Sequence, residues 1–271
     1  MRKLQLVVIV FVFLLNFCTG VFPQNISISG KEVQKIGEKV FENECAGKDE
    51  CLLEWNEGEK FMSLGIGHFI WYPQGQTSPF EESFPKFLEY LKSTGQKIPG
   101  WLNTTPVPKC PWVSKDDFLR NRRSPRAIEL RQLLSSTKSR QSDFLVKRLN
   151  DALPLMLKSA PQAKRQQIRE QFYSLTATPV GVYALVDYVN FKGLGTSSTE
   201  RYRGRGWGLL QILSEMSWQN DSRKALEEFV QVADKVLVAR VKNAPPDRKE
   251  EKWLPGWQRR VKSYLEFTTK N

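Results

Sequence analysis

Histidine is almost missing from this 271-residue chain, in which His68 is the only one. A zinc site of the HExxH type needs two histidines on one helix, so this class of site and other multi-histidine sites are excluded. Cysteine is also scarce, with four residues and no CxxC pair. We therefore expect carboxylates to carry any acid–base chemistry, and we expect neither a metal nor a cofactor.

Long apolar runs are missing except at the N-terminus. Arg2 and Lys3 precede an apolar run over 6–15, and small residues follow, which is the pattern of a secretory signal peptide over residues 1–20. A membrane span needs about 20 apolar residues, so a retained N-terminal anchor is the less favoured alternative, and lipid attachment at Cys18 is a third. We predict a chain that is exported to the periplasm or secreted, without stable membrane insertion after cleavage.

Three cysteines remain if the signal peptide is removed. Disulfides persist in exported proteins, and Cys45 can pair either with Cys51 or with Cys110. Spacing does not decide between these pairings. A structural disulfide with one free thiol is the expected outcome.

Acidic residues are few relative to basic ones. Removing Arg2 and Lys3 from the 41 basic residues leaves 39 against 29 acidic residues, a net charge of +10. An exported basic protein meets wall polymers, phospholipid headgroups or lipopolysaccharide rather than nucleic acid. The basic segment 120–169 is interpreted as a solvated helical face, or alternatively as a surface that faces a polyanion.

The chain from residue 31 reads as a helix followed by a β-hairpin. Apolar residues at helical spacing predict a helix that ends near Cys45, and Glu44 falls about 40° from the apolar stripe, so it points inward. The hairpin is predicted from two strands at 52–55 and 61–71 joined by a turn at 56–59. Along the second strand Leu64, Ile66, His68 and Ile70 share an apolar face, which favours a core histidine, while Gly65 and Gly67 leave the other face open.

The rest of the chain is predicted to be almost wholly helical. The expected fold class is α+β, mainly α, with one small β-hairpin and an enlarged helical part. The mature chain is expected to form one domain of two lobes, the first over about 28–95 and the second over about 96–271. Helices are expected at 83–94, 124–136, 140–157, 161–175, 180–192, 206–216, 222–242 and 256–267.

An inward glutamate followed by acids, a hydroxyl and glycines is suited to glycoside hydrolysis. This reaction needs a carboxylic acid with a raised pKa on one side of the scissile bond and a carboxylate or held water on the other. The predicted apolar setting of Glu44 assigns it the acid role. Glu59 or Glu57, together with Ser63, is assigned the orientation of water, and Gly65 and Gly67 are expected to admit the sugar.

These residues carry a resemblance to a known family. The run 63–68, Ser-Leu-Gly-Ile-Gly-His, follows a helix-terminal glutamate and resembles the Thr-Ile-Gly-x-Gly-His strand of phage-type lysozymes, in the lysozyme-like superfamily. The run 183–193 is similar to a buried helix of that family that ends at its cleft, and the segment 257–264, with Arg259 and Arg260, is similar to its closing helix, which is rich in tryptophan and arginine. The resemblance implies a lysozyme-like fold, with Glu44 as the catalytic acid. The loop after Glu44 is longer than in that family, glutamate replaces aspartate and Ser63 replaces threonine, so the second acid stays open between Glu57 and Glu59.

A second cluster at 200–211 mixes glycine, aromatic and amide side chains. Its Gly-Leu-Leu-Gln run resembles a segment of lytic transglycosylases that lines their saccharide cleft. Sugars are bound by aromatic faces and by amide donors, so Tyr202, Trp207, Gln211 and Asn190 are candidate substrate-binding residues. Trp207 is alternatively a core residue.

These observations predict an exported muramidase that hydrolyses the glycan of peptidoglycan or of another anionic cell wall. A lytic transglycosylase that uses Glu44 as both acid and base is the enzymatic alternative. The non-enzymatic alternatives are a wall-binding module of the same fold and a polyanion-binding protein that acts through its basic helices. In an unrelated fold, Glu44 would be only a helix-end charge.

Overall fold

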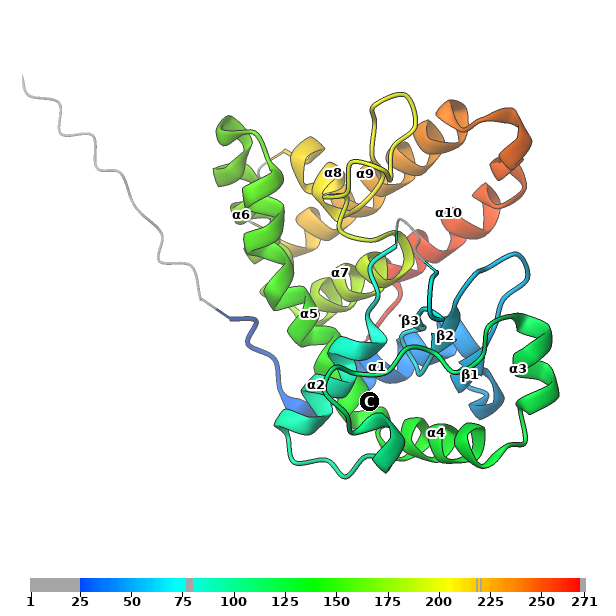
Figure 1. The fold of residues 1–271 in the computed structure, drawn as a ribbon. Coiled ribbons are helices and arrows are strands. Elements are labelled where there is room, and N and C mark those ends of the chain that lie inside the picture. Colours follow the sequence, from blue (N-terminus) through cyan, green and yellow to red (C-terminus); the bar gives the residue numbers. More distant parts are fainter. Residues whose placement is uncertain (1–24, 77–79, 218, 220, 269–271) are drawn as a thin grey trace, which may run out of the picture.

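The computed structural model describes residues 25–76, 80–217, 219 and 221–268. The predicted signal peptide lies outside these residues. The described chain is mainly helical with one small antiparallel sheet, so the predicted α+β class is confirmed (Figure 1). The helices are α1 Gly30–Cys45, α2 Phe84–Ser93, α3 Lys115–Asn121, α4 Pro125–Ser136, α5 Lys138–Ser159, α6 Arg165–Thr176, α7 Pro179–Lys192, α8 Leu209–Glu215, α9 Ser222–Asn243 and α10 Leu254–Lys262.

Helix α1 begins at a capping box. The Ser29 hydroxyl accepts a hydrogen bond from the Glu32 backbone N–H, and the Glu32 carboxylate accepts one from the Ser29 backbone, which satisfies donors that the first turn would leave unpaired. Its apolar face packs on α5, where Gly37 lies directly against Ser142. A Cβ at position 37 would lie 1.7 Å from Ser142 Oγ, so this helix pair requires glycine.

The prediction of one continuous second strand over 61–71 is wrong, because the structure divides this segment into two strands. The sheet has three strands in the order β1 Leu53–Glu54, β2 Met62–Leu64 and β3 Phe69–Trp71, with Leu53 opposite Leu64 and Ser63 opposite Ile70. Residues 65–68 form a tight turn between β2 and β3, in which Gly65 and His68 have φ of +70° and +46°. The alternating strand face expected from Gly65 to His68 is therefore absent, because the two glycines shape a turn instead of a strand.

Helix α7 is the central helix of the described chain. Every residue from Gly181 to Val189 is buried, as expected for a helix that is covered on all sides. Its partners include α1, α5, α6 and α8. Figure 1 shows α7 between the sheet region and the part that contains α8, α9 and α10. Its apolar sequence contains one buried acid, Asp187, which is fully shielded from solvent.

The segment after residue 96, which the sequence assigns to the second lobe, returns to the sheet. Trp101 packs against Trp71, and Trp71 Nε1 donates a 3.0 Å hydrogen bond to the carbonyl of Pro108. Helix α4 packs on the short helical turn Asp49–Leu52 that precedes β1. Residues 98–136 thus extend the first lobe, and α3 was not expected from the sequence.

The three cysteines that the structure describes form one disulfide and one buried thiol, as the sequence predicts. Cys45 is bonded to Cys51, which decides between the two pairings left open, and Cys110 is free and buried. Burial raises the pKa of the Cys110 thiol to about 12, which makes it unreactive near neutral pH. Among the described residues, no helix combines the length and apolar character that a membrane span requires.

Candidate active site

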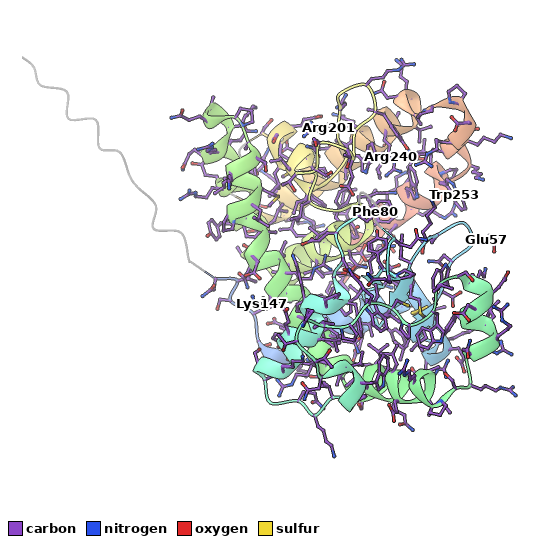
Figure 2. The ribbon with its side chains drawn as sticks, viewed as in Figure 1. Glu57, Phe80, Lys147, Arg201, Arg240 and Trp253 are labelled. Carbon is purple, nitrogen blue, oxygen red and sulfur yellow. A yellow bond between two sulfur atoms is a disulfide. The ribbon has the colours of Figure 1, made fainter. Side chains whose placement is uncertain are left out.

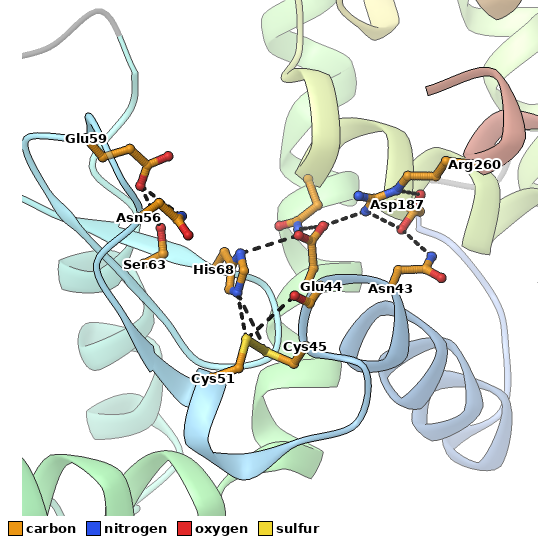
Figure 3. Close-up of polar contacts among 11 residues, drawn as sticks. Asn43, Glu44, Cys45, Cys51, Asn56, Glu59, Ser63, His68, Asp187 and Arg260 are labelled. Atoms are coloured by element: carbon orange, nitrogen blue, oxygen red, sulfur yellow. Dashed lines mark hydrogen bonds and ion pairs between the residues drawn. A yellow bond between two sulfur atoms is a disulfide. The ribbon is translucent and has the colours of Figure 1, made fainter. Parts of the chain in front are cut away.

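The Glu44 carboxylate lies at the end of α1, where three elements meet. Its side chain is 14% exposed, and Oε1 accepts hydrogen bonds from Arg260 Nη2 and, at 3.1 Å, from Asn190 Nδ2 (Figure 3). The inward orientation predicted from the helical wheel is therefore correct. The predicted apolar surroundings of Glu44 are wrong. The earlier turns of α1 bury apolar residues, whereas its last turn faces the Arg260 guanidinium and the Asn190 amide.

Arg260 is held by a buried acid on α7. Asp187 accepts 2.8 Å hydrogen bonds from both Nε and Nη2 of Arg260, and a 2.7 Å bond from the Tyr264 hydroxyl. Asn43 Nδ2 adds a 3.0 Å bond to Asp187. A bidentate pair of this kind fixes the plane of the guanidinium, so Asp187 determines where Arg260 meets Glu44.

His68 lies on the opposite side of Glu44. Its Nδ1 is 3.4 Å from Glu44 Oε2, and its Nε2 is 3.2 Å from Cys51 Sγ (Figure 3). The disulfide sulfur carries no proton, so only the imidazole can donate at the Nε2–Sγ contact. The interpretation of His68 as a core residue misses the contact with Glu44, which exists because the 65–68 turn places the ring against the end of α1.

The two candidates for the second acid differ in their surroundings. Glu59 is half-buried, accepts a 3.0 Å hydrogen bond from Asn56 and contacts the Ser63 hydroxyl at 3.4 Å. Figure 3 shows this group on the far side of His68 from Glu44. Glu57 is 91% exposed, pairs with Lys115 and points outward at the edge of the molecule (Figure 2). The geometry therefore favours Glu59 over Glu57.

The two glutamates are expected to give opposite pH dependences of stability. Burial raises the pKa of Glu59 above its usual value of 4.5, so folding favours its protonated form and the free energy of unfolding falls as the pH rises through this range. The hydrogen bond from Lys115 lowers the pKa of Glu57, so its stabilisation is present above 4.5 and is lost as the pH falls. Raising the pH from about 4 to about 7 should thus make Glu59→Gln more stable relative to wild type, and Glu57→Gln slightly less stable. Urea unfolding at both pH values measures this, and equal trends for the two variants would contradict it.

A cavity of about 410 Å³ opens beside the partners of Glu44. His68 and Asn190 line it, as do three more of the residues proposed from the sequence to bind substrate: Gly67, Tyr202 and Trp207. The Tyr202 and Trp207 rings are in contact, with centroids 4.6 Å apart, and the Tyr202 hydroxyl donates to Glu250. Trp207 is 8% exposed, so it belongs to the core and to the cavity wall at once.

Two of the proposed binding residues have structural roles. A Cβ at Gly65 would lie 2.2 Å from Gln141 Oε1. The space beside this glycine is therefore filled by the Gln141 side chain and is not open to a sugar. Gln211 accepts a hydrogen bond from the Gly208 N–H and donates one to the Gly195 carbonyl, at 2.9 and 3.0 Å. Both ends of the Gln211 amide are thus used to hold the loop that follows α7.

Asp187, Arg260 and Asn43 were not assigned to the site from the sequence. Asp187 carries a usable signal, because an acid within a continuous apolar helix requires a buried partner. Arg260 lies in the closing segment 257–264, where the sequence pattern gives it no role. Asn43 carries no signal of its own.

No protein-family model matches this chain, and no curated protein or solved structure was found to be similar to it.

Proposed function

We propose that this chain is an exported glycosidase of lysozyme-like fold that hydrolyses the glycan strands of peptidoglycan. The single observation that carries the proposal is the position of the Glu44 carboxylate. It is shielded from bulk water and held by Arg260 and Asn190, and two of the side chains that it contacts, Asn190 and His68, line a cavity with aromatic walls. Buried carboxyl groups at the edge of a saccharide-sized cavity are suited to general acid catalysis.

The proposed mechanism begins with proton transfer from Glu44 to the glycosidic oxygen, whose bond to the anomeric carbon breaks. Arg260 and Asn190 then stabilise the carboxylate that remains, since both donate hydrogen bonds to Oε1. His68 contacts the other oxygen and holds the carboxyl group in orientation. It is a positioning residue in this scheme.

Glu59 is assigned the second role. Water attacks the anomeric carbon and gives a proton to the Glu59 carboxylate, while the Ser63 hydroxyl 3.4 Å away helps to orient that carboxylate. Carboxylates and water suffice for this reaction, so the proposal includes no metal or cofactor.

The proposed location is outside the cytoplasm. Its support is the N-terminal sequence pattern together with the Cys45–Cys51 disulfide, which follows Glu44 directly and fits an oxidising compartment. Peptidoglycan, or another anionic wall glycan, is the proposed partner.

Product analysis tests the reaction type. We expect mature protein to release fragments of purified peptidoglycan whose new sugar ends are hydrated and can be reduced by borohydride. Mass spectrometry separates these ends from anhydro ends, which are lighter by one water molecule. Anhydro ends throughout the digest would contradict hydrolysis and favour the transglycosylase alternative, in which Glu44 acts as both acid and base.

A further inference from the structure

The two disulfide-bonded cysteines and His68 form a compact group of side chains beside Glu44. Their two sulfurs and the histidine ring nitrogen all lie within 4.8 Å of one another. Among the described residues, no other set of three or more cysteine, histidine or acidic side chains lies close enough together to hold one metal ion. Figure 3 shows contacts from the His68 ring to the disulfide on one side and to Glu44 on the other. The proposed mechanism uses only the Glu44 side of the ring, which leaves the sulfur side without a function.

The distances from the ring nitrogen to the two sulfurs are close to those of a tetrahedral zinc site. His68 Nε2 lies 3.2 Å from Cys51 Sγ and 3.6 Å from Cys45 Sγ. With Zn–S bonds of about 2.3 Å and a Zn–N bond of about 2.0 Å, a tetrahedral ion holds its sulfur and nitrogen ligands about 3.5 Å apart. The same nitrogen faces both sulfurs, so its lone pair can point toward an ion that lies between them.

The sulfur–sulfur bond is what prevents this arrangement in the disulfide form. Two thiolates on one tetrahedral zinc ion lie about 3.8 Å apart, so the disulfide must first be reduced and the sulfurs must then separate. Cys51 lies in the short helical turn Asp49–Leu52 and is only partly buried. Rotation of the Cys51 side chain can therefore provide the separation while the end of α1 keeps its place.

Glu44 supplies the second shell that such a site requires. Its Oε2 is 3.4 Å from His68 Nδ1, the ring nitrogen that does not face the sulfurs. A histidine that binds a metal through one nitrogen usually donates its other N–H to a carboxylate, which fixes the ring and its tautomer. Two thiolates balance the charge of a divalent ion, so the bound ion would add no net charge close to Arg260. His68 also lines the cavity of about 410 Å³, through which an ion can reach the ring.

We propose that Cys45, Cys51 and His68 bind one zinc ion when the disulfide is reduced, with a water molecule as the fourth ligand. Thiolates and imidazole are ligands that zinc prefers, and three protein ligands leave one position open. The reductant is a thiol of the kind that keeps cytoplasmic cysteines reduced. Two such thiols give their electrons to the disulfide and become a disulfide themselves, which leaves two cysteine thiols. Zinc then displaces one proton from each cysteine and one from Nε2.

The effect of this zinc site on Glu44 rests on the proposed function. In the disulfide form Nε2 donates toward Cys51, so Nδ1 is free to accept the proton of the Glu44 carboxyl group. In the zinc form Nε2 binds the ion, the proton lies on Nδ1, and Glu44 is the ionised acceptor. A carboxylate that has passed its proton to His68 cannot protonate a glycosidic oxygen. The zinc form is therefore inactive, and the acid is restored when a disulfide donor outside the cytoplasm reoxidises the cysteines and zinc is released.

Cobalt(II) is the probe for the metal site, because it takes the place of zinc and its tetrahedral thiolate complexes absorb light. The full mature chain is reduced with a phosphine under nitrogen and titrated with cobalt chloride, beside the disulfide form. We expect thiolate-to-cobalt absorption that saturates at one ion per reduced chain and disappears when zinc is added. The disulfide form should show none of this absorption, since its sulfurs are bonded to each other.

Three substitutions locate the ion. Cys51→Ser should lose the saturable absorption, because it removes one thiolate. Glu44→Gln should weaken cobalt binding by about 10- to 100-fold, the usual effect of losing the carboxylate partner of a metal-bound histidine. Cys110→Ser is the matched control, since this buried free thiol is not part of the group, and its spectrum should equal that of wild type. Circular dichroism follows the fold of each reduced chain, and if reduction unfolds the chain, zinc should restore the helical signal.

The outcomes separate the metal site from the proposed function. The site is overturned if reduced wild type gives no cobalt absorption and zinc restores no structure. It is also overturned if the absorption persists in the disulfide form or in Cys51→Ser, or is lost in Cys110→Ser. Cobalt binding as expected, with no cleavage of peptidoglycan by the disulfide form, would leave the metal site standing and contradict the proposed function. Equal cleavage by the zinc-loaded and disulfide forms would contradict the effect of zinc on Glu44.

Discussion

Glu44→Gln is expected to reduce the clearing of purified peptidoglycan by about 10²- to 10⁴-fold, the range typical for loss of a general acid. The amide has the shape of the carboxyl group and can still accept hydrogen bonds from Arg260 and Asn190, but it cannot protonate a leaving oxygen. The measurement is the fall in turbidity with time for mature wild type and variant, with circular dichroism to check that both are folded.

Glu42→Gln is the matched control on the same helix. Glu42 is 65% exposed and pairs with Lys39, so its replacement should leave the clearing rate unchanged. Clearing by Glu44→Gln at the wild-type rate would remove Glu44 from the mechanism. If neither wild type nor Glu44→Gln clears the substrate while both bind it, the wall-binding alternative is favoured. A binding affinity that falls steeply with salt concentration and is the same for wild type and Glu44→Gln favours the polyanion alternative.

Asp187→Asn is expected to lower the free energy of unfolding by about 3–5 kcal/mol, the usual cost of removing one partner from a buried ion pair. The Asp187 side chain is fully buried and Arg260 is 17% exposed, so the guanidinium would lose its bidentate partner in a poorly solvated place and keep only its contact with the Glu44 carboxylate. Urea unfolding followed by circular dichroism measures the effect, and an unchanged slope would show that the change lies in stability.

A surface ion pair provides the comparison for Asp187. Glu215→Gln removes one partner of the Arg205 pair, whose side chains are 45% and 40% exposed. Exposed pairs contribute about 0–1 kcal/mol, so this variant should unfold almost like wild type. A similarly small effect for Asp187→Asn would mean that the Asp187–Arg260 pair is not what holds α7 and α10 together.

Local sequence signals explain why most helices were predictable. Ser124 followed by Pro125 marks the start of α4, and the Ser124 hydroxyl does cap that helix. The helical spacing of apolar residues in α1 likewise predicts its buried face, which includes Val33, Ile36 and Val40. These features depend on neighbours within about one helical turn, so they can be inferred without the fold.

The turn at 65–68 shows where local reasoning fails. Strand alternation over 61–71 is a valid local pattern, but the backbone N–H of Ile66 donates to Gln141, 75 residues away on α5. Gly65 fits tightly against the same side chain. A tertiary contact thus decides between strand and turn, and with it the orientation of His68.

The sequence by itself determined the helical class, the inward orientation of Glu44 and a cysteine content that permits one disulfide. Only the tertiary structure decided what surrounds Glu44. Arg260 lies 216 residues from it and Asp187 lies 73 residues from Arg260, and no periodicity links such distant positions. Periodicity reports which side of an element is buried, whereas the partner of a buried charge depends on how α1, α7 and α10 pack together.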